Sequence, residues 1–386
     1  MKIILWLLVS INFLSLECQK RLDSNILNNS TTYQSSFGAD NTLNKYLISA
    51  PRAICVNETN DIYVLDENYF KVFSTDGKGK DIFGGKGEGP KEFIIGYFPS
   101  IGPNGYLTVI DGYSGNYFSL FSPQNEFLFK INIYTKDIYR NYYNNQGLSI
   151  FGLFYIISIN EKRRFMEYLV FDDKSNDFFR VYNSLLYEDN GKLMEIVSYK
   201  SPRTILTDRG TRHFDFRGIF LWSVASDTTV FFTNPYLESN NNEYTINVYN
   251  VNTKKTRTIK HSYEPVIISD EIKNFFDHSK TYPLLEDVVK KVFNETKYYP
   301  AVNNILIDKN RLFVVKYNNN DKNEILTDIF DIISGKYLFS VYFPVSLRIH
   351  DNIYVIKNGF LYKIDFNEEK YFVIKKYKLN ESIYKN

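Results

Sequence analysis

The sequence predicts an all-β fold, a six-bladed β-propeller, from three observations: a strand phrase that returns early in the chain, a strand-pair rhythm that continues to its end, and a high aromatic content. The phrase is Asp-Ile-Tyr-Val-Leu-Asp at residues 61–66 and Tyr-Leu-Thr-Val-Ile-Asp at residues 106–111. Each phrase is followed by a second aromatic strand, at residues 70–73 and 117–121, and then by a polar turn. A strand-only unit that recurs at roughly 40 to 50 residues is typical of a propeller blade.

Length and charge narrow the classes of protein to consider. A propeller routinely spans 386 residues as one closed domain with a continuous core. Tyrosine and phenylalanine supply most of the 17% aromatic residues, which suits sheets whose faces pack on each other. The 46 basic and 44 acidic residues leave a net charge of only +2, so we expect no nucleic-acid partner. We treat the protein as a monomer.

The first residues have the pattern of an export signal. Lys2 precedes an almost wholly apolar run at residues 3–16, which is too short for a stable membrane span. Residues 14–18, Leu-Ser-Leu-Glu-Cys, resemble the cleavage box of a bacterial lipoprotein, in which Cys18 becomes the lipid-bearing first residue. Glu17 departs from that pattern, because a small residue is usual there. An ordinary secretory leader and an uncleaved anchor are the alternatives.

The leader sets the predicted boundaries and compartment. We predict a signal peptide at residues 1–17, a tether at 18–48 and the propeller at 49–386. The predicted location is the bacterial cell envelope, either as a lipoprotein held to the membrane by its lipid alone or as a periplasmic or extracellular protein. The other cysteine, Cys55, lies in an apolar strand and is expected to be a core residue.

Four further strand pairs bring the number of predicted blades to six. Each pair is built mainly of β-branched and aromatic residues. Ring closure requires strands from the chain ends to share a blade, and residues 370–374 and residues near 46–49 are the candidates. The four pairs lie at residues 154–157 and 168–172, 229–232 and 244–249, 311–315 and 328–331, and 352–356 and 360–365.

The spacing between predicted blades is stretched twice, once before residue 229 and once before residue 311. The second stretch, residues 270–297, carries an apolar stripe at helical spacing. We predict a short helical insertion there, between blades four and five, with the stripe packed on the sheet edges. A partner-binding helix is the alternative. The stripe consists of Leu284, Leu285, Val288, Val289, Val292 and Phe293.

A glycine-rich phrase joins the first two predicted blades. Residues 82–93 read Ile-Phe-Gly-Gly-Lys-Gly-Glu-Gly-Pro-Lys-Glu-Phe. The glycines permit a tight crossing, Pro90 sets its exit, and Phe93 can fill the gap between adjacent sheets. A phosphate-binding loop does not fit, because no Lys-Ser/Thr pair follows and no helix starts there.

This phrase resembles the inter-blade sequence of NHL-repeat propellers, with a specific match across the first two blades. The whole layout resembles the six-bladed propeller lipoproteins of bacterial envelopes. The resemblance implies a fold, a compartment and a binding role, and it carries no catalytic residue.

Polar side chains end several predicted strands at positions that look equivalent: Asp66, Asp111, Asn234 and Asn358. In one interpretation they meet at the mouth of the central channel, where a calcium-dependent hydrolase or lyase would gather such groups. In the other, each caps a turn through backbone hydrogen bonds, and we favour this interpretation. No metal-ligand spacing links the histidines, so we expect no cofactor, calcium being required only under the enzyme alternative.

The densest polar group lies in the first insertion, at residues 208–217. Arg209, Arg212, His213 and Arg217 are candidates for binding a carboxylate, a phosphate or a sugar acid. Ordinary surface ion pairs with the neighbouring aspartates are the alternative. We therefore predict an exported, lipid-anchored binding or scaffolding module for an unknown small ligand or envelope protein, rather than an enzyme.

Overall fold

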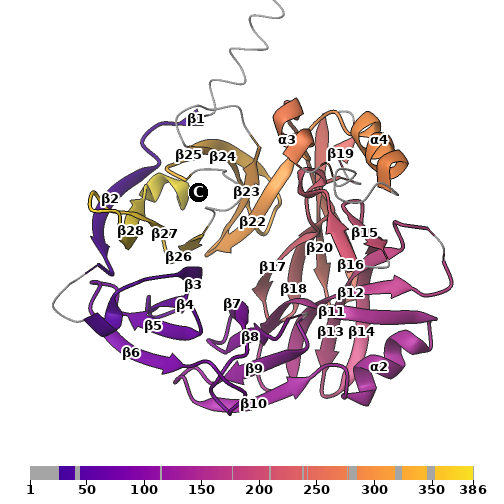
Figure 1. Ribbon diagram of the computed structural model, residues 1–386. Coiled ribbons are helices and arrows are strands. Elements are labelled where there is room, and N and C mark those ends of the chain that lie inside the picture. Colours follow the sequence, from indigo (N-terminus) through magenta and orange to yellow (C-terminus); the bar gives the residue numbers. More distant parts are fainter. Residues whose placement is uncertain are drawn as a thin grey trace, which may run out of the picture.

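The computed structural model describes residues 26–385 except 40–43, 114, 176, 208–209, 237–238, 241, 276, 278–284, 318–323 and 346–352. The predicted leader and Cys18 lie outside the described residues. Six antiparallel sheets surround a common centre (Figure 1), which confirms the six-bladed β-propeller. We number these sheets as blades 1 to 6 in chain order.

Each blade has four strands in a meander from the centre outward. Blades 1 to 3 contain β3 (Pro51–Val56), β4 (Ile62–Asp66), β5 (Tyr69–Phe73) and β6 (Gly79–Gly84); β7 (Gly96–Ile101), β8 (Leu107–Asp111), β9 (Tyr117–Phe121) and β10 (Phe127–Asn132); β11 (Leu148–Ser158), β12 (Arg163–Asp172), β13 (Val181–Asp189) and β14 (Lys192–Lys200). Blades 4 to 6 contain β17 (Leu221–Ser226), β18 (Thr229–Thr233), β20 (Glu243–Asn250) and β21 (Lys255–Ser262); β22 (Val302–Asp308), β23 (Arg311–Lys316), β24 (Ile325–Asp331) and β25 (Tyr337–Phe343); β26 (Tyr354–Lys357), β27 (Phe360–Phe366), β28 (Phe372–Leu379) and β2 (Thr31–Phe37).

Two of the six predicted strand pairs occupy a different place in their blades from the other four. The pairs of blades 1, 2, 4 and 5 are second and third strands, as the repeated phrase suggests. The pairs of blades 3 and 6 are instead first and second strands, because β11 and β26 are as rich in aromatic and β-branched residues as β12 and β27. Strand composition alone does not separate these positions.

The N-terminal strand β2 closes the ring. It pairs antiparallel with β28 from Thr31↔Leu379 to Phe37↔Ile374 and forms the outer strand of blade 6. The short strand β1 (Ile26–Leu27) pairs parallel with β25 at the edge of blade 5. The propeller therefore begins within the predicted tether 18–48, well before residue 49. Residues near 46 form a 3-10 turn, η1 (Asn44–Tyr46), and not a strand.

The strand order gives the ring two distinct faces. In every blade, the turns between first and second strands and between third and fourth strands lie on one face, which we call the turn face. The turns between second and third strands and the links between blades lie on the opposite face, which we call the connection face. Adjacent first strands contact one another around most of the centre.

The insertions all belong to links between blades. Helix α2 (Asp137–Asn144), which we did not predict, joins blades 2 and 3 and buries Tyr139 and Tyr143 against blade 3. The hairpin of β15 (Thr204–Thr207) and β16 (Gly210–His213), with η2 (Asp215–Arg217), joins blades 3 and 4. Remaining short elements are β19 (Ser239–Asn240), beside β20, and η5 (Glu381–Ile383) at the C-terminal end.

Two helices, α3 (Asp270–Phe275) and α4 (Glu286–Glu295), confirm the predicted insertion between blades 4 and 5. The apolar side chains of α4 pack on the other insertion, against Ile205, Phe214 and Phe216, and not on the sheet edges. The two insertions lie side by side (Figure 1), and their apolar side chains form one buried cluster. This supports core packing for the stripe, although Leu284 lies outside the described residues.

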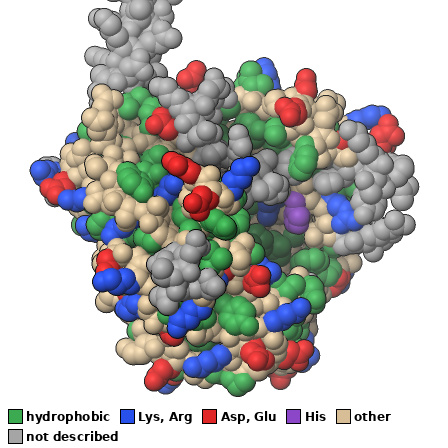
Figure 2. Space-filling model, turned by 60° about the vertical axis from the view of Figure 1, so that its left-hand side comes forward, with side chains coloured by type: hydrophobic (Ala, Val, Ile, Leu, Met, Phe, Trp, Pro, Cys, Tyr) green, Lys and Arg blue, Asp and Glu red, His purple; other side chains and the backbone are tan. Residues whose placement is uncertain are grey.

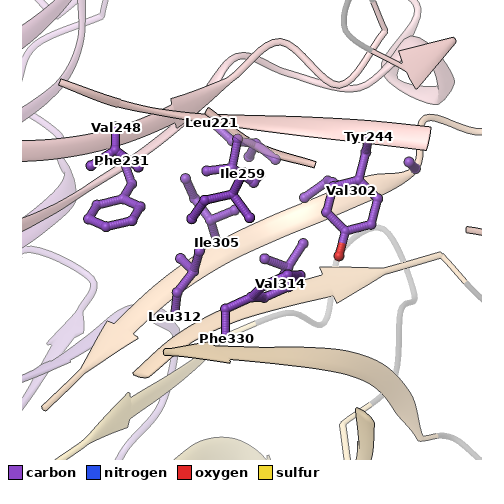
Figure 3. Close-up of a cluster of buried hydrophobic side chains, with 12 residues drawn as sticks. Leu221, Phe231, Tyr244, Val248, Ile259, Val302, Ile305, Leu312, Val314 and Phe330 are labelled. Atoms are coloured by element: carbon purple, nitrogen blue, oxygen red, sulfur yellow. The ribbon is translucent and has the colours of Figure 1, made fainter. Parts of the chain in front are cut away.

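Six buried apolar clusters fill the gaps between neighbouring blades, one at each junction. Between blades 4 and 5, Phe231 and Ile259 belong to one buried cluster with Val314 and Phe330 (Figure 3). Between blades 1 and 2, Phe93 is fully buried, which confirms its predicted role as a plug between the sheets.

The glycine-rich link contributes to that junction through two positions. Gly84 has a φ of 101° and Gly85 a φ of 154°. A Cβ atom on Gly84 would lie 2.7 Å from the carbonyl oxygen of Asn68, so this turn requires glycine.

Charged side chains of both signs are scattered over the face seen in Figure 2, with hydrophobic side chains between them. Within the described part of the chain, no helix has the length and hydrophobicity needed to cross a membrane.

Removing β2 should destabilise the whole ring. A shortened chain that begins at residue 26 keeps β2, whereas one that begins at residue 39 leaves β28 as an open edge. Each lost backbone hydrogen bond costs roughly 0.5–1.5 kcal/mol, so the second chain should melt at least roughly 5 °C lower. Circular dichroism during heating measures this difference, and equal melting temperatures would contradict the assigned closure.

Candidate functional site

The first strands of all six blades enclose a central channel. Its cavity has a volume of about 810 Å³. Aliphatic residues make up much of its lining. Aromatic and charged residues that line it from blades 1 to 4 include Arg52, Phe98, Phe154, Tyr155, Glu167 and Trp222.

Aromatic rings form one side of the channel. The rings of Phe98 and Phe154 lie 5.3 Å apart between blades 2 and 3. The rings of Tyr155 and Trp222 meet edge to face at 5.1 Å between blades 3 and 4. These contacts present aromatic faces and edges to the cavity, a wall suited to an apolar or flat ligand group.

Glu167 places a buried carboxyl behind this aromatic wall. Only 2% of the residue is exposed. Its carboxyl oxygens accept hydrogen bonds from Trp222 Nε1 at 2.8 Å and from Asn183 Nδ2 at 2.6 Å. Burial raises the pKa of Glu167 from 4.5 to about 7, although these two hydrogen bonds and the charge of Arg203 act in the opposite direction.

Asp66 and Asp111 tie incoming chain segments to their blades. Asp66 accepts hydrogen bonds from the backbone N–H groups of Ser49 and Ala50 and pairs with Lys71 at 2.5 Å. Asp111 makes the equivalent bond, at 2.9 Å, to the backbone N–H of Ile95, and pairs with a lysine, Lys130. Both carboxylates thus accept hydrogen bonds from backbone N–H groups at strand ends, as the turn-capping interpretation expects. These N–H groups belong to the chain segment that leads into the blade.

The four candidate mouth residues do not surround one opening. Asp66, Asp111 and Asn234 follow second strands and lie on the connection face. Asn358 follows the first strand β26, so it lies on the turn face, where its side chain donates hydrogen bonds to the backbone oxygens of Asn57 and Glu58. Of the four, Asn358 alone lines the channel. A polar residue at the end of a predicted strand does not show whether that strand is the first or the second of its blade, and so does not show on which face the residue lies.

The arginine group of the first insertion is divided by the fold. Arg209 lies outside the described residues. Arg212 and His213 lie on β16, where His213 Nδ1 is 3.1 Å from Thr204 Oγ1. Arg217 is 4% exposed and pairs with Glu295 at 3.1 Å, which holds η2 to α4.

Bonds within the protein occupy the rest of the Arg217 guanidinium. It donates hydrogen bonds to Thr296 Oγ1 and to the backbone oxygen of Pro202. Its cation also lies over the ring of Tyr236, at 5.0 Å. These contacts give Arg217 a structural function in joining the two insertions.

Among the described residues, no three His, Cys, Asp or Glu side chains are grouped so that they could hold a metal ion. Cys55 lines the channel but is buried, and burial raises the pKa of its thiol well above the usual range.

The sequence analysis missed the aromatic wall and Glu167. One signal was present for Glu167, a single carboxylate inside the otherwise apolar run 165–171. For Phe98, the following Pro99 indicates irregular strand pairing. Neither signal locates the residue at the ring centre, because that depends on which strand lies innermost.

Comparisons with known proteins leave the family open. No family model matches the chain, and no curated protein matches it. Among solved structures, a candidate exported protein from Bacteroides fragilis aligns over 90% of this chain and 94% of its own, with 14% identity and a TM-score of 0.46. A gluconolactonase from Xanthomonas campestris aligns over 86% and 87%, with 8% identity and a TM-score of 0.43. A candidate 6-phosphogluconolactonase from Bacteroides fragilis aligns over 86% of each chain, with 9% identity and a TM-score of 0.35.

Glu167 should make stability depend on pH. Its pKa is higher in the folded protein than in the unfolded chain, so its contribution is complete below pH 4.5 and is lost as pH rises through about 7. In wild type, Glu167 should lower the free energy of unfolding by about 3 kcal/mol across that interval. In Glu167→Gln this decrease should be absent. Urea unfolding at several pH values measures it, with the exposed Glu88→Gln as control. Parallel pH profiles for wild type and Glu167→Gln would refute this role.

Proposed function

We propose that this protein is a binding module whose small ligand occupies the central channel. The observation that carries the proposal is the cavity of about 810 Å³ enclosed by all six blades. Sites for small ligands are typically roughly 300–1,000 Å³ and are largely formed before the ligand arrives. A ring held by six buried junctions supplies such a preformed wall.

The composition of the wall supports the same function. Ligand sites combine apolar and aromatic surface with a few placed polar groups. Here the rings of Phe98, Phe154 and Trp222 supply the first, while Arg52 and Glu167 supply charged or polar groups. Among the described residues, no group of acidic or histidine side chains adds support for the alternative, a calcium-dependent hydrolase or lyase, which stays a prediction.

Filling the channel should abolish ligand retention. Ser223 lines the cavity, so Ser223→Trp should occupy part of it, whereas Gln34→Trp adds the same ring on the exposed outer strand β2. Each protein is incubated with the small-molecule fraction of the producing cells, and retained compounds are identified by mass spectrometry after rapid gel filtration. Melting temperatures check the fold.

We expect wild type and Gln34→Trp to retain a compound that folded Ser223→Trp does not. Equal retention by all three proteins, or no retention by any, would overturn the channel proposal.

Export and lipid anchoring remain part of the proposal, on the evidence of residues 1–18. The start of the propeller at β1 limits the distance at which an anchor on Cys18 could hold it from the membrane. Because β1 begins at Ile26, only residues 19–25 separate Cys18 from the propeller. Seven extended residues span at most roughly 25 Å. A lipid on Cys18 would therefore hold the edge of blade 5 close to the membrane surface.

Labelling with radioactive palmitate tests the anchor. In a bacterium that processes lipoproteins, wild type and Cys55→Ala should incorporate label, and Cys18→Ala should incorporate none. Unchanged labelling of Cys18→Ala, or an unlabelled wild type, would exclude this lipid site.

A scaffolding role for an envelope partner has less support. The apolar stripe of α4 is buried within the insertions, so it offers no free helix face. Exposed apolar side chains there are limited, among the described residues, to Ile267, Phe275 and Tyr298.

A further inference from the structure

Three consecutive first strands have an irregularity at the same level of the channel. The antiparallel register shifts at Arg52 in β3, at Phe98 and Pro99 in β7, and at Phe154 in β11. A β-bulge leaves a residue out of the ladder and turns its side chain in a new direction, and bulges are common next to functional sites. Blades 1 to 3 therefore each present one redirected side chain to the channel.

The redirected side chains lie close together near the connection face. The rings of Phe98 and Phe154 are 5.3 Å apart. Arg52 donates a long hydrogen bond, 3.4 Å, to the backbone oxygen of Gly96, two residues before Phe98. The guanidinium of Arg203, from the link between blades 3 and 4, lies 5.8 Å from the centre of the Phe154 ring. Arg203 thus contacts the Phe154 ring, and Arg52 lies beside the strand that carries Phe98.

The backbone at Phe98 is strained. Its φ is 46°, in the left-handed region that bulky residues rarely adopt. Yet 44% of the residue remains exposed, so the strain does not serve core packing. Such strain persists where the position of a side chain matters for function.

The charge at this mouth is positive. Arg52 is exposed and forms no ion pair within the described part of the chain. The nearest carboxyl in the wall, Glu167, is buried, and burial disfavours its charged form. The wall's other acidic residues, Glu58 and Asp308, lie at the turn face.

We propose that this mouth binds a small aromatic carboxylate. Its flat ring lies against Phe98 and Phe154, and its carboxylate meets the guanidinium group of Arg52. A cationic ligand would meet the like charge of Arg52. The inference rests on the proposed channel function and specifies the ligand class.

Three probes with the same ring system test the charge preference: 2-naphthoate, 2-naphthylmethanol and 2-naphthylmethylammonium. Calorimetric titration gives their affinities for wild type, Arg52→Gln, Phe98→Ala and the control Arg140→Gln, which changes an exposed arginine on α2. Naphthoate should bind wild type at least about tenfold more tightly than the other two probes, as expected for one hydrogen bond to a charged group.

The variants distinguish the anion contact of Arg52 from the ring contact of Phe98. Arg52→Gln should reduce the preference for naphthoate by roughly tenfold and leave naphthylmethanol unchanged. Phe98→Ala should weaken all three probes alike, and Arg140→Gln should match wild type. Loss of the preference only in Arg52→Gln supports the assignment.

Three results would overturn it. Equal affinity for the three probes removes the anion preference but leaves the channel proposal standing. A preference that survives Arg52→Gln places the anion elsewhere. If no probe binds wild type while the gel-filtration experiment does retain a compound, the ligand class is wrong and the channel function is right; if that experiment also fails, both are wrong.

Discussion

Everything in this protein depends on the packing of each sheet against the next, which is complete only when the ring is closed. Each junction buries a cluster of aliphatic and aromatic side chains, and a missing blade would expose two such faces to water. Strand β2 completes blade 6 across the gap between the two ends of the chain. The outermost strands can then be polar: in β21, only Ile259 is buried. Polar outer strands discourage edge-to-edge association.

Buried polar groups make the packing at these apolar junctions more specific. Asp328 of blade 5 is fully buried and accepts a hydrogen bond from Tyr244 of blade 4 at 2.8 Å, while Lys316 pairs with it at 2.8 Å. Figure 3 shows the Tyr244 hydroxyl directed toward blade 5. Arg311, also fully buried, donates to the backbone oxygen of Ile383 and so docks the C-terminal turn. An unpaired member of such a set is costly to bury, so these contacts favour one arrangement of neighbours.

Strand pairing is irregular at several positions of the channel wall. Register shifts occur in several blades, in outer strand pairs as well as in first strands. A rigid frame tolerates local irregularity because the surrounding junctions hold the strands in place. At Arg52, Phe98 and Phe154 the irregular position also lines the channel, and this combination gives these residues a claim to a function.

The sequence by itself determined the fold class, the number of blades, the helical insertion and the plug at Phe93. These features follow from short-range patterns, namely strand composition, helical spacing and glycine-rich turns. Ring closure by residues 31–37 was missed, because Thr-Thr-Tyr-Gln-Ser-Ser-Phe has the composition of a linker and becomes a strand only beside β28. The candidate site was missed almost entirely, and Asn358 was assigned with residues of the opposite face.

Only the tertiary structure decided which strand of each blade lies innermost and therefore which side chains share the channel. Arg52, Phe98 and Phe154 are distant in sequence and have no common local motif. Their proximity results from long-range pairing and from sheet packing around a centre, which depend on the whole chain and are not encoded in any local segment.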